Sequence, residues 1–246
     1  MRAPRLTSAR LLAAAPVFAC LGDPAGAEDA ASSRFKNRLY FYSGLDVASD
    51  NAYGWAGVAW APFDLMDREG LRLRFQGGGG QYRYRTSSVA GGWNTVTKSD
   101  GELLAGWQFL RGQQALALYG GINVTSDLLA QPDPWNRDQG THVGAKFLAE
   151  WYARLGEHLV ATAAAGYSTA DRTVTARATI AHRLDGDMEI GTEAATFADE
   201  ESTEARAGLF LALPWEGRIF RFAGGWRWDD DSEDGPYGTI SLFMRY

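Results

Sequence analysis

Apolar and polar residues alternate with a period of two along most of the chain from residue 39 onward. Leu71, Leu73 and Phe75, for example, alternate with Arg72 and Arg74. Because successive side chains of a β-strand point to opposite faces, this pattern is typical of strands with one apolar and one polar face. Turn residues separate about twelve such segments, which predicts an all-β chain of antiparallel strands. The segments cover residues 39–48, 51–62, 70–85, 98–110, 114–124, 139–153, 157–168, 172–183, 187–197, 203–213, 218–228 and 237–246.

Strands of this kind fit either a soluble sandwich, whose apolar face is the core, or a transmembrane barrel, whose apolar face meets lipid. The last strand favours the barrel, because Ile240, Leu242, Met244 and the final Tyr246 share one face, an ending that the assembly machinery of outer-membrane barrels recognises. Aromatic residues also lie near many of the predicted strand ends, and such rings favour the membrane–water boundary. We therefore predict an antiparallel up-and-down transmembrane β-barrel of about 12 strands, within a range of roughly 10 to 14.

The connections between the predicted strands alternate in length, as they do in outer-membrane barrels. The first two connections depart from this rule, because 49–50 is short and 63–69 is longer. Short turns are predicted at 111–113, 154–156, 184–186 and 214–217, and mostly longer loops at 86–97, 125–138, 198–202 and 229–236.

Residues 1–27 have the features of a cleavable signal peptide: a basic start, a short apolar stretch and Ala-Gly-Ala at 25–27. Cleavage would remove Cys20, the one cysteine of the chain, so that no disulfide framework is expected. We predict a periplasmic lead-in at 28–38 and a barrel domain at 39–246. The expected location is the outer membrane of a Gram-negative bacterium, with the lipids of that membrane as partners.

The composition excludes several classes of protein. The chain has 246 residues and a formal charge of −6 spread along its length, which argues against a nucleic-acid partner. No run of about 18 apolar residues predicts a transmembrane helix. The many glycines and the nine tryptophans suit a sheet-rich barrel.

Charged residues on the polar face are predicted to point into the lumen, because Arg or Lys costs about 2–4 kcal/mol on the lipid face at mid-membrane. Such a lumen would be either closed by salt bridges or open as a narrow aqueous path or a sugar-lined groove. The predicted lumenal set is Arg72, Arg74, Glu102, His142, Lys146, Glu150, Arg177, Glu189, Glu193, Glu204, Arg206, Arg221 and Arg227.

The glycine run at 77–80 lacks the Lys-Ser/Thr of a phosphate-binding loop. Charged residues have even numbers before the run, at Arg72 and Arg74, and odd numbers after it, at Arg83 and Arg85. If charges always face inward, the change of parity requires an extra residue in the strand. We therefore predict a β-bulge or kink at the glycines.

No catalytic or metal-binding motif is evident. His142, His158 and His182 are scattered, so that no metal and no cofactor is predicted. A membrane-embedded esterase could in principle join His142 or His182 to Ser168 or Ser202, but the spacing gives no support and no nucleophile elbow occurs. The chain is therefore predicted to be non-enzymatic, without catalytic residues.

The predicted loop 125–138 contains Pro132-Asp133-Pro134 followed by Trp135. The prolines indicate a rigid surface turn, and the indole could stack on a sugar ring. The three aspartates of this loop do not have EF-hand spacing for Ca²⁺. An acidic run at 229–234 is interpreted as a solvated surface, with divalent ions bridging lipopolysaccharide as the alternative.

Two stretches resemble the bacterial cellulose biosynthesis protein BcsS family. The resemblance runs from about Tyr40 to Trp151 and implies an outer-membrane β protein that accompanies cellulose synthase, with no catalytic residues to transfer. Its motifs are Tyr42-Ser-Gly44 through Asp50, Tyr53-Gly-Trp55-Ala-Gly57, Gly70-Leu-Arg72-Leu-Arg74, Tyr82-Arg-Tyr84, Tyr119-Gly-Gly121-Ile-Asn123, Pro132-Asp133-Pro134-Trp135-Asn136, Gly140, Gly144-Ala-Lys146 and Glu150-Trp151.

We predict a barrel that assists cellulose biosynthesis or secretion, with the cellulose chain and components of the synthase complex as candidate partners. The alternatives are an outer-membrane lipid hydrolase, acting on lipid A or phospholipid, and a passive structural or adhesive protein. The residues predicted to contact a glucan are Arg72, Arg74, Trp93, Trp135, Lys146 and Glu150.

Overall fold

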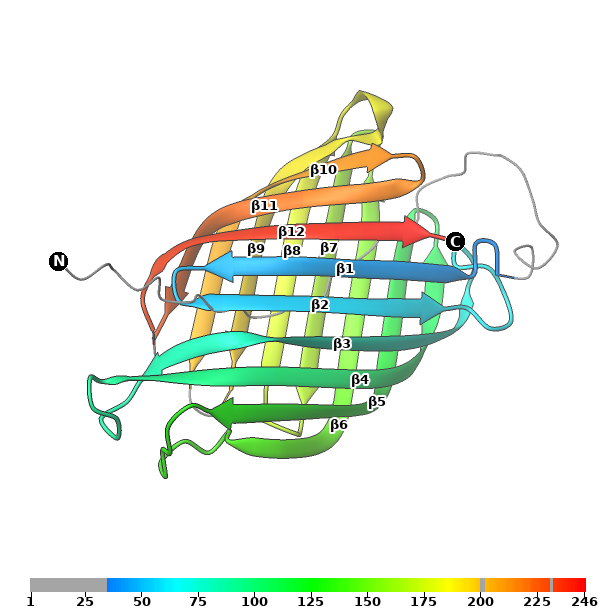
Figure 1. Ribbon diagram of the computed structural model, residues 1–246. Helices are drawn as coiled ribbons and strands as arrows, with labels where there is room; N and C mark the ends of the chain where they lie inside the picture. Colours follow the sequence, from blue (N-terminus) through cyan, green and yellow to red (C-terminus); the bar gives the residue numbers. More distant parts are fainter. Residues whose placement is uncertain (1–34, 200–201, 231) are drawn as a thin grey trace.

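The chain forms a closed β-barrel of antiparallel strands (Figure 1). The computed structural model describes residues 35–199, 202–230 and 232–246, so the predicted leader and most of the lead-in lie outside the described residues. A helix of the length and apolar character needed for a membrane span is absent from these ranges. The strands are β1 (Leu39–Ala48), β2 (Asn51–Trp60), β3 (Gly70–Arg85), β4 (Trp93–Arg111), β5 (Gln114–Leu129), β6 (Gly140–Leu155), β7 (Leu159–Ser168), β8 (Val174–Arg183), β9 (Glu189–Ala198), β10 (Thr203–Trp215), β11 (Arg218–Asp229) and β12 (Gly235–Arg245).

Each strand pairs with its neighbours in the chain, and β1 closes the sheet by pairing with β12 from Tyr40↔Arg245 to Ala48↔Tyr237. This closure leaves no free sheet edge, which a lipid environment requires because unpaired backbone groups are costly there. Leu39 and Arg245 therefore lie at one end of the barrel, which we call the terminal end; the other is the far end. The predicted fold class, an up-and-down barrel with about 12 strands, is confirmed.

The strand positions agree with the predicted segments except toward the far end of β4 and β5. The sequence pattern predicts a strand at 98–110, but β4 begins at Trp93, and β5 continues to Leu129 rather than to residue 124. The added residues include several Thr and Ser, and polar and apolar residues occur on both faces there, so the alternation of polarity disappears. The ladder nevertheless continues, because Trp93 pairs with Arg85 and Val96 pairs with Leu129. In Figure 1 the β3–β4 hairpin extends beyond the β1–β2 turn.

The barrel is apolar outside and polar inside, the reverse of a soluble domain. Phe75 is 56% exposed on the outer wall, whereas its neighbour Arg74 is buried in the lumen. An apolar outer band is the surface that a transmembrane barrel presents to lipid. Large apolar residues exposed on the outer wall include Leu103, Phe109, Leu118, Ile122, Val143, Phe147, Ile180, Leu209, Phe222 and Ile240.

The β-bulge predicted at Gly77–Gly80 is wrong. The register of β3 against β4 runs without interruption from Gly70↔Gln108 to Arg85↔Trp93. The glycines instead provide space: a Cβ on Gly78 would lie 2.4 Å from the hydroxyl of Tyr53, whose ring lies over that position. Since the parity does not change, odd-numbered Arg83 and Arg85 lie on the outer face.

Candidate functional site in the barrel lumen

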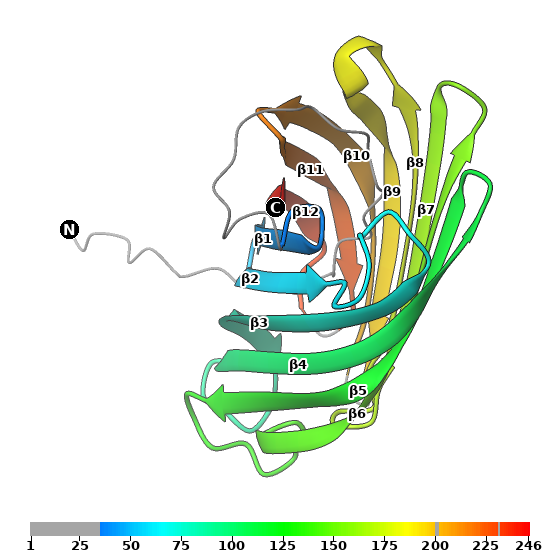
Figure 2. The ribbon, with the colours of Figure 1, turned by 90° about the vertical axis from the view of Figure 1, so that its right-hand side faces the viewer.

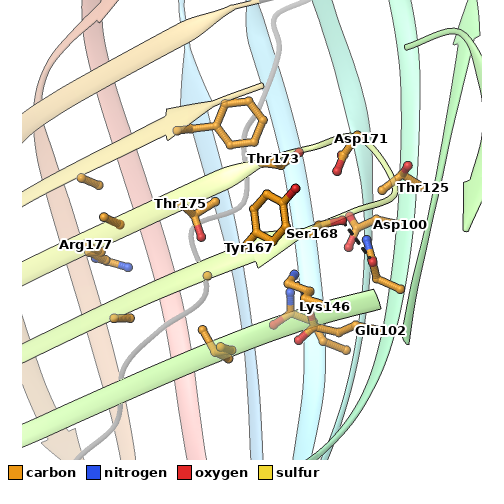
Figure 3. Close-up of a pocket in the computed structure, with 18 of the residues that line it drawn as sticks. Asp100, Glu102, Thr125, Lys146, Tyr167, Ser168, Asp171, Thr173, Thr175 and Arg177 are labelled. Atoms are coloured by element: carbon orange, nitrogen blue, oxygen red, sulfur yellow. Dashed lines mark hydrogen bonds and ion pairs between the residues drawn. The ribbon is translucent and has the colours of Figure 1, made fainter. Parts of the chain in front are cut away.

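A cavity of ≈ 130 Å³ lies inside the barrel along the β6–β9 wall (Figure 3). Inward positions of β7, β8 and β9 that carry small side chains leave space for it, whereas larger lining residues such as Tyr53, Arg74 and Arg206 come from β2, β3 and β10. A cavity of this volume, with polar groups among its lining residues, has room for several water molecules. Its small lining residues include Ala164, Gly166 and Ser168 of β7, Thr175 of β8 and Ala195 of β9.

The lining of this cavity combines hydroxyl groups with charges of both signs. Lys98 lies 3.8 Å from Asp127 and 3.9 Å from Asp171 at the far end of the cavity. Ser168 donates a hydrogen bond to Oδ1 of Asn123 at 3.1 Å. Such a wall offers hydrogen-bond donors and acceptors to water or to a polyhydroxylated molecule.

Arg74 is the centre of an ion-pair cluster that crosses the lumen. Its Nε lies 3.0 Å from Glu102, and its Nη1 lies 2.7 Å from Glu150. Lys146 lies 2.5 Å from the other oxygen of Glu102. Arg74 lines both the large cavity and a second cavity of ≈ 50 Å³ nearer the terminal end. The cluster therefore forms a septum between the two cavities.

A second ion-pair cluster fills the lumen beside β8–β12. Glu193 forms ion pairs with Arg177 at 2.5 Å and with Arg221 at 2.6 Å. It also accepts a hydrogen bond from the hydroxyl of Tyr237 at 2.7 Å. Arg206 pairs with Asp46 at 2.7 Å, which ties β10 to β1. These charges partner one another, so this half of the lumen is occupied by salt bridges.

Residues 61–69, which we call the plug loop, connect β2 to β3 and lie at the terminal mouth of the barrel (Figure 2). The guanidinium group of Arg72 donates hydrogen bonds to the carbonyls of Leu65, Met66 and Arg68. Gln108 donates to the same carbonyls of Met66 and Arg68, at 2.9 and 3.1 Å. Met66 is 4% exposed and packs in an apolar cluster at the mouth.

Sequence reasoning identified Arg72 as a lumenal residue but not as the anchor of this loop. The anchor forms because the loop precedes β3 directly and Arg72, the third residue of that strand, points inward beneath it. The available signal was the connection at 63–69, which is longer than the other turns at this end.

The structure brings some of the predicted glucan-contacting residues together and separates others. Arg74, Lys146 and Glu150 share the septum cluster. The two tryptophans lie instead at the far end of the barrel. Trp93 is covered by Arg83 and Arg85, whose guanidinium carbons lie 5.0 and 5.1 Å from its ring centroid.

Trp135 is 81% exposed on the loop between β5 and β6, residues 130–139. Asp133 fixes this loop: it accepts hydrogen bonds from Thr86 at 2.7 Å and Tyr84 at 2.9 Å, and from the backbone of Trp135 at 3.1 Å. The hydrogen bond from Thr86 is the main reason that the pKa of Asp133 is lowered to about 2. These hydrogen bonds therefore hold the loop in one conformation, in which the side chain of Trp135 is exposed.

Neither a metal-binding cluster nor a histidine–serine contact occurs among the described residues. No three His, Cys, Asp or Glu side chains in the described part of the chain form a group that could hold a metal ion. Nε2 of His142 lies 3.2 Å from the carbonyl oxygen of Gln139, and the rings of His158 and His182 lie side by side in a tilted arrangement with centroids 5.6 Å apart. The contacts of the described histidines thus do not join any of them to a serine.

Comparisons with known proteins agree with the barrel. The family model described as cellulose biosynthesis protein BcsS matches residues 40–246. The solved structure of KdgM porin is similar, with 7% identity, 84% of this chain and 99% of that chain covered, and a TM-score of 0.53. KdgM porin in complex with disordered oligogalacturonate gives 9% identity, the same coverages and the same TM-score. The transport unit of the autotransporter AIDA-I from Escherichia coli gives 11% identity, 86% and 90% coverage, and a TM-score of 0.50. At these identities the likeness shows an outer-membrane type of barrel fold. The comparison with curated proteins found no match.

Proposed function

The chain belongs to the family of the cellulose biosynthesis protein BcsS, and from that membership we propose that it is a non-catalytic outer-membrane barrel that assists the production or secretion of cellulose. The supporting observation is the extent of the match, which covers the barrel from Tyr40 in β1 to Tyr246. The barrel itself is therefore the unit that the family shares. The inverted distribution of polarity supports a site in the membrane.

The proposed orientation places the terminal end in the periplasm of a Gram-negative bacterium. Export by a cleavable signal peptide at residues 1–27 would deliver the chain to that compartment. Most turns at the terminal end are short, as in known outer-membrane barrels. The plug loop would then face the periplasm, where components of the cellulose synthase complex could reach it.

We propose that the large cavity is one part of a narrow polar passage for a glucan. Hydroxyl groups and ion-paired side chains along it can exchange hydrogen bonds with sugar hydroxyls. In the described conformation the septum at Arg74 and the plug loop narrow this passage. At the far end, Trp135 has an uncovered ring for stacking on a sugar, whereas the ring of Trp93 is already covered by Arg83 and Arg85.

Cellulose output of the native host tests the proposal. Deletion of the gene should lower the glucose released by cellulase from washed cells, and the wild-type gene should restore it. Trp135→Ala should restore it only in part, whereas Trp228→Ala, a change of another exposed tryptophan, should restore it fully. Unchanged cellulose in the deletion strain would contradict the proposal.

The filled lumen favours a second candidate, a structural outer-membrane protein without transport. The cluster around Glu193 and the septum at Arg74 occupy much of the interior with paired charges. Single-channel recording with cello-oligosaccharides separates the two candidates: passage or block of current by the sugar supports transport, and an inert barrel supports the structural role. Turnover of cello-oligosaccharides or phospholipid by the purified protein would contradict a non-catalytic role in either case.

A further inference from the structure

The outer wall of the barrel carries a restricted set of charges. Every carboxylate of the strands falls on an inward position, and the charged residues on outward positions are four arginines. Arg83 and Arg85 lie at the far end, and Arg111 and Arg218 lie at the terminal end. A lipid-facing wall excludes charge from the hydrocarbon but not from the headgroup regions. The position of each arginine along the barrel axis therefore decides what it faces.

The first pair lies above the apolar band. Arg83 follows Leu71, which is also outward on β3, by twelve residues. With a rise of about 3.4 Å per residue and a strand tilt of about 40°, this places Arg83 roughly 31 Å and Arg85 roughly 36 Å above Leu71. The apolar band of such barrels is only about 25 Å tall. Both guanidinium groups therefore lie at the level of lipid headgroups.

The wall around the pair is also polar. Gln81, the next outward residue below Arg83 on β3, donates a hydrogen bond to Thr97 at 3.4 Å. Further along the same face, Ser126 and Thr141 form a hydrogen bond at 3.0 Å. These outward polar residues agree with a headgroup position for this part of the sheet.

The indole ring of Trp93 contacts the guanidinium groups of both Arg83 and Arg85. Its ring centroid lies 5.0 Å from the guanidinium carbon of Arg83 and 5.1 Å from that of Arg85, so that one indole supports both cations. Arg85 lies 3.9 Å from Glu233, with both side chains more than half exposed, a contact that solvent screens strongly. The hydrogen-bond donors of the two guanidinium groups are thus available to an anion in the membrane surface.

We propose that Arg83, Arg85 and Trp93 bind the phosphate group of an anionic glycolipid in the outer leaflet. Guanidinium groups match phosphate oxygens with two parallel hydrogen bonds, and two adjacent arginines match a phosphorylated headgroup better than one. An indole at this level suits the sugar and interfacial part of such a lipid. This inference rests on the membrane location proposed above, but not on the role in cellulose production.

Native mass spectrometry of the detergent-purified barrel tests the site. The probes are bisphosphorylated lipid A, the same lipid after phosphatase treatment, and inorganic phosphate. The wild-type barrel should retain the phosphorylated lipid, and the double variant Arg83→Gln/Arg85→Gln should bind it about tenfold or more weakly. The matched control Arg111→Gln/Arg218→Gln removes the same charge from the terminal end and should bind like wild type. Heat-dependent gel mobility verifies that each variant is a folded barrel.

Three results would overturn the inference: equal binding by the Arg83/Arg85 variant, equal binding of the dephosphorylated lipid, or displacement of the lipid by an equimolar amount of inorganic phosphate. The last result would show a site for free anions rather than for a lipid. Cellulose output of the deletion strain is measured in a separate experiment, because it tests the proposed function and not the lipid site. Normal cellulose in the deletion strain together with intact lipid binding would refute the proposed function and leave this site standing.

Discussion

Nη1 of Arg74 lies 2.7 Å from Oε1 of Glu150, although the two residues are 76 positions apart in the chain. Arg74 is on β3 and Glu150 is on β6, and these strands are not neighbours in the sheet, so the pair spans the lumen rather than running along the wall. Glu102 and Lys146 extend the pair into the septum. Ion pairs in the lumen therefore connect the strands of the barrel, in addition to the backbone hydrogen bonds of the sheet.

The first prediction concerns the contribution of the Arg74–Glu150 ion pair to the stability of the barrel. Arg74→Met should lower the free energy of unfolding by about 3–5 kcal/mol, because it leaves the carboxylate of Glu150 buried without its cation. Adding Glu150→Gln should recover part of that loss, since the remaining polar group is neutral. Urea unfolding in detergent, followed by tryptophan fluorescence, measures both variants. Additive losses in the double variant would show that the pair is not coupled.

The second prediction concerns passage through the lumen. Shortening residues 62–67 to a tight turn removes the plug loop, and Arg74→Ala removes the septum. The combined variant should show a higher single-channel conductance than wild type or either single change, because the two barriers lie in series. A matched control shortens the loop at 89–91 at the far end, which leaves Thr86 and its hydrogen bond to Asp133 in place, and should leave conductance unchanged. Equal conductance of wild type and the combined variant would contradict a blocked passage at these two points.

The third prediction concerns the support of Trp135. The lowered pKa of Asp133, about 2, means that the charged carboxylate is stabilised in the folded loop, chiefly by the hydrogen bond from Thr86. This contribution is fully present above the ordinary pKa of about 4 and is lost as the pH falls from about 4 to about 2. A spin label at Arg137→Cys, in a chain carrying Cys20→Ser, should become mobile over that range.

A substitution that removes the charge of Asp133 should have the same effect on the spin label at neutral pH. Asp133→Asn should mobilise the label at position 137, because the amide replaces one acceptor oxygen with a donor. Asp64→Asn, a control in the plug loop, should have no effect on the label. A label that stays immobile in Asp133→Asn would show that the prolines alone hold the loop.

The strand order and the closed barrel could be predicted from the chain because the lipid imposes one simple rule on each strand. Alternate residues must be apolar wherever the wall crosses the hydrocarbon, and this rule locates β1 and β3 to the residue. The rule ends where the strands leave the membrane. The sequence pattern therefore does not predict the start of β4 at Trp93, since polar and apolar residues occur on both faces of the sheet there.

The contacts inside the lumen could be predicted only as a group. Parity places Arg72, Arg74 and Glu150 on inward positions, and the structure confirms this placement. Which of them pair depends on the register of several strands and on the shape of the plug loop. Arg72 is thus an anchor for backbone carbonyls, whereas Arg74, two residues later, is an ion-pair partner.

The error at the glycine run leads to the fourth prediction, which compares two adjacent glycines. A Cβ on Gly80 would lie 2.1 Å from the backbone carbonyl oxygen of Ala52, which cannot move without disturbing β2. A Cβ on Gly79 would point outward, with its nearest neighbour 3.3 Å away at Lys98. Gly80→Ala should therefore lower the free energy of unfolding by about 1–3 kcal/mol, and Gly79→Ala should change it much less. A bulge at this run would tolerate both changes, because an extra residue would already separate the two strands. Equal stability of the two variants in urea would thus favour the bulge over the continuous register.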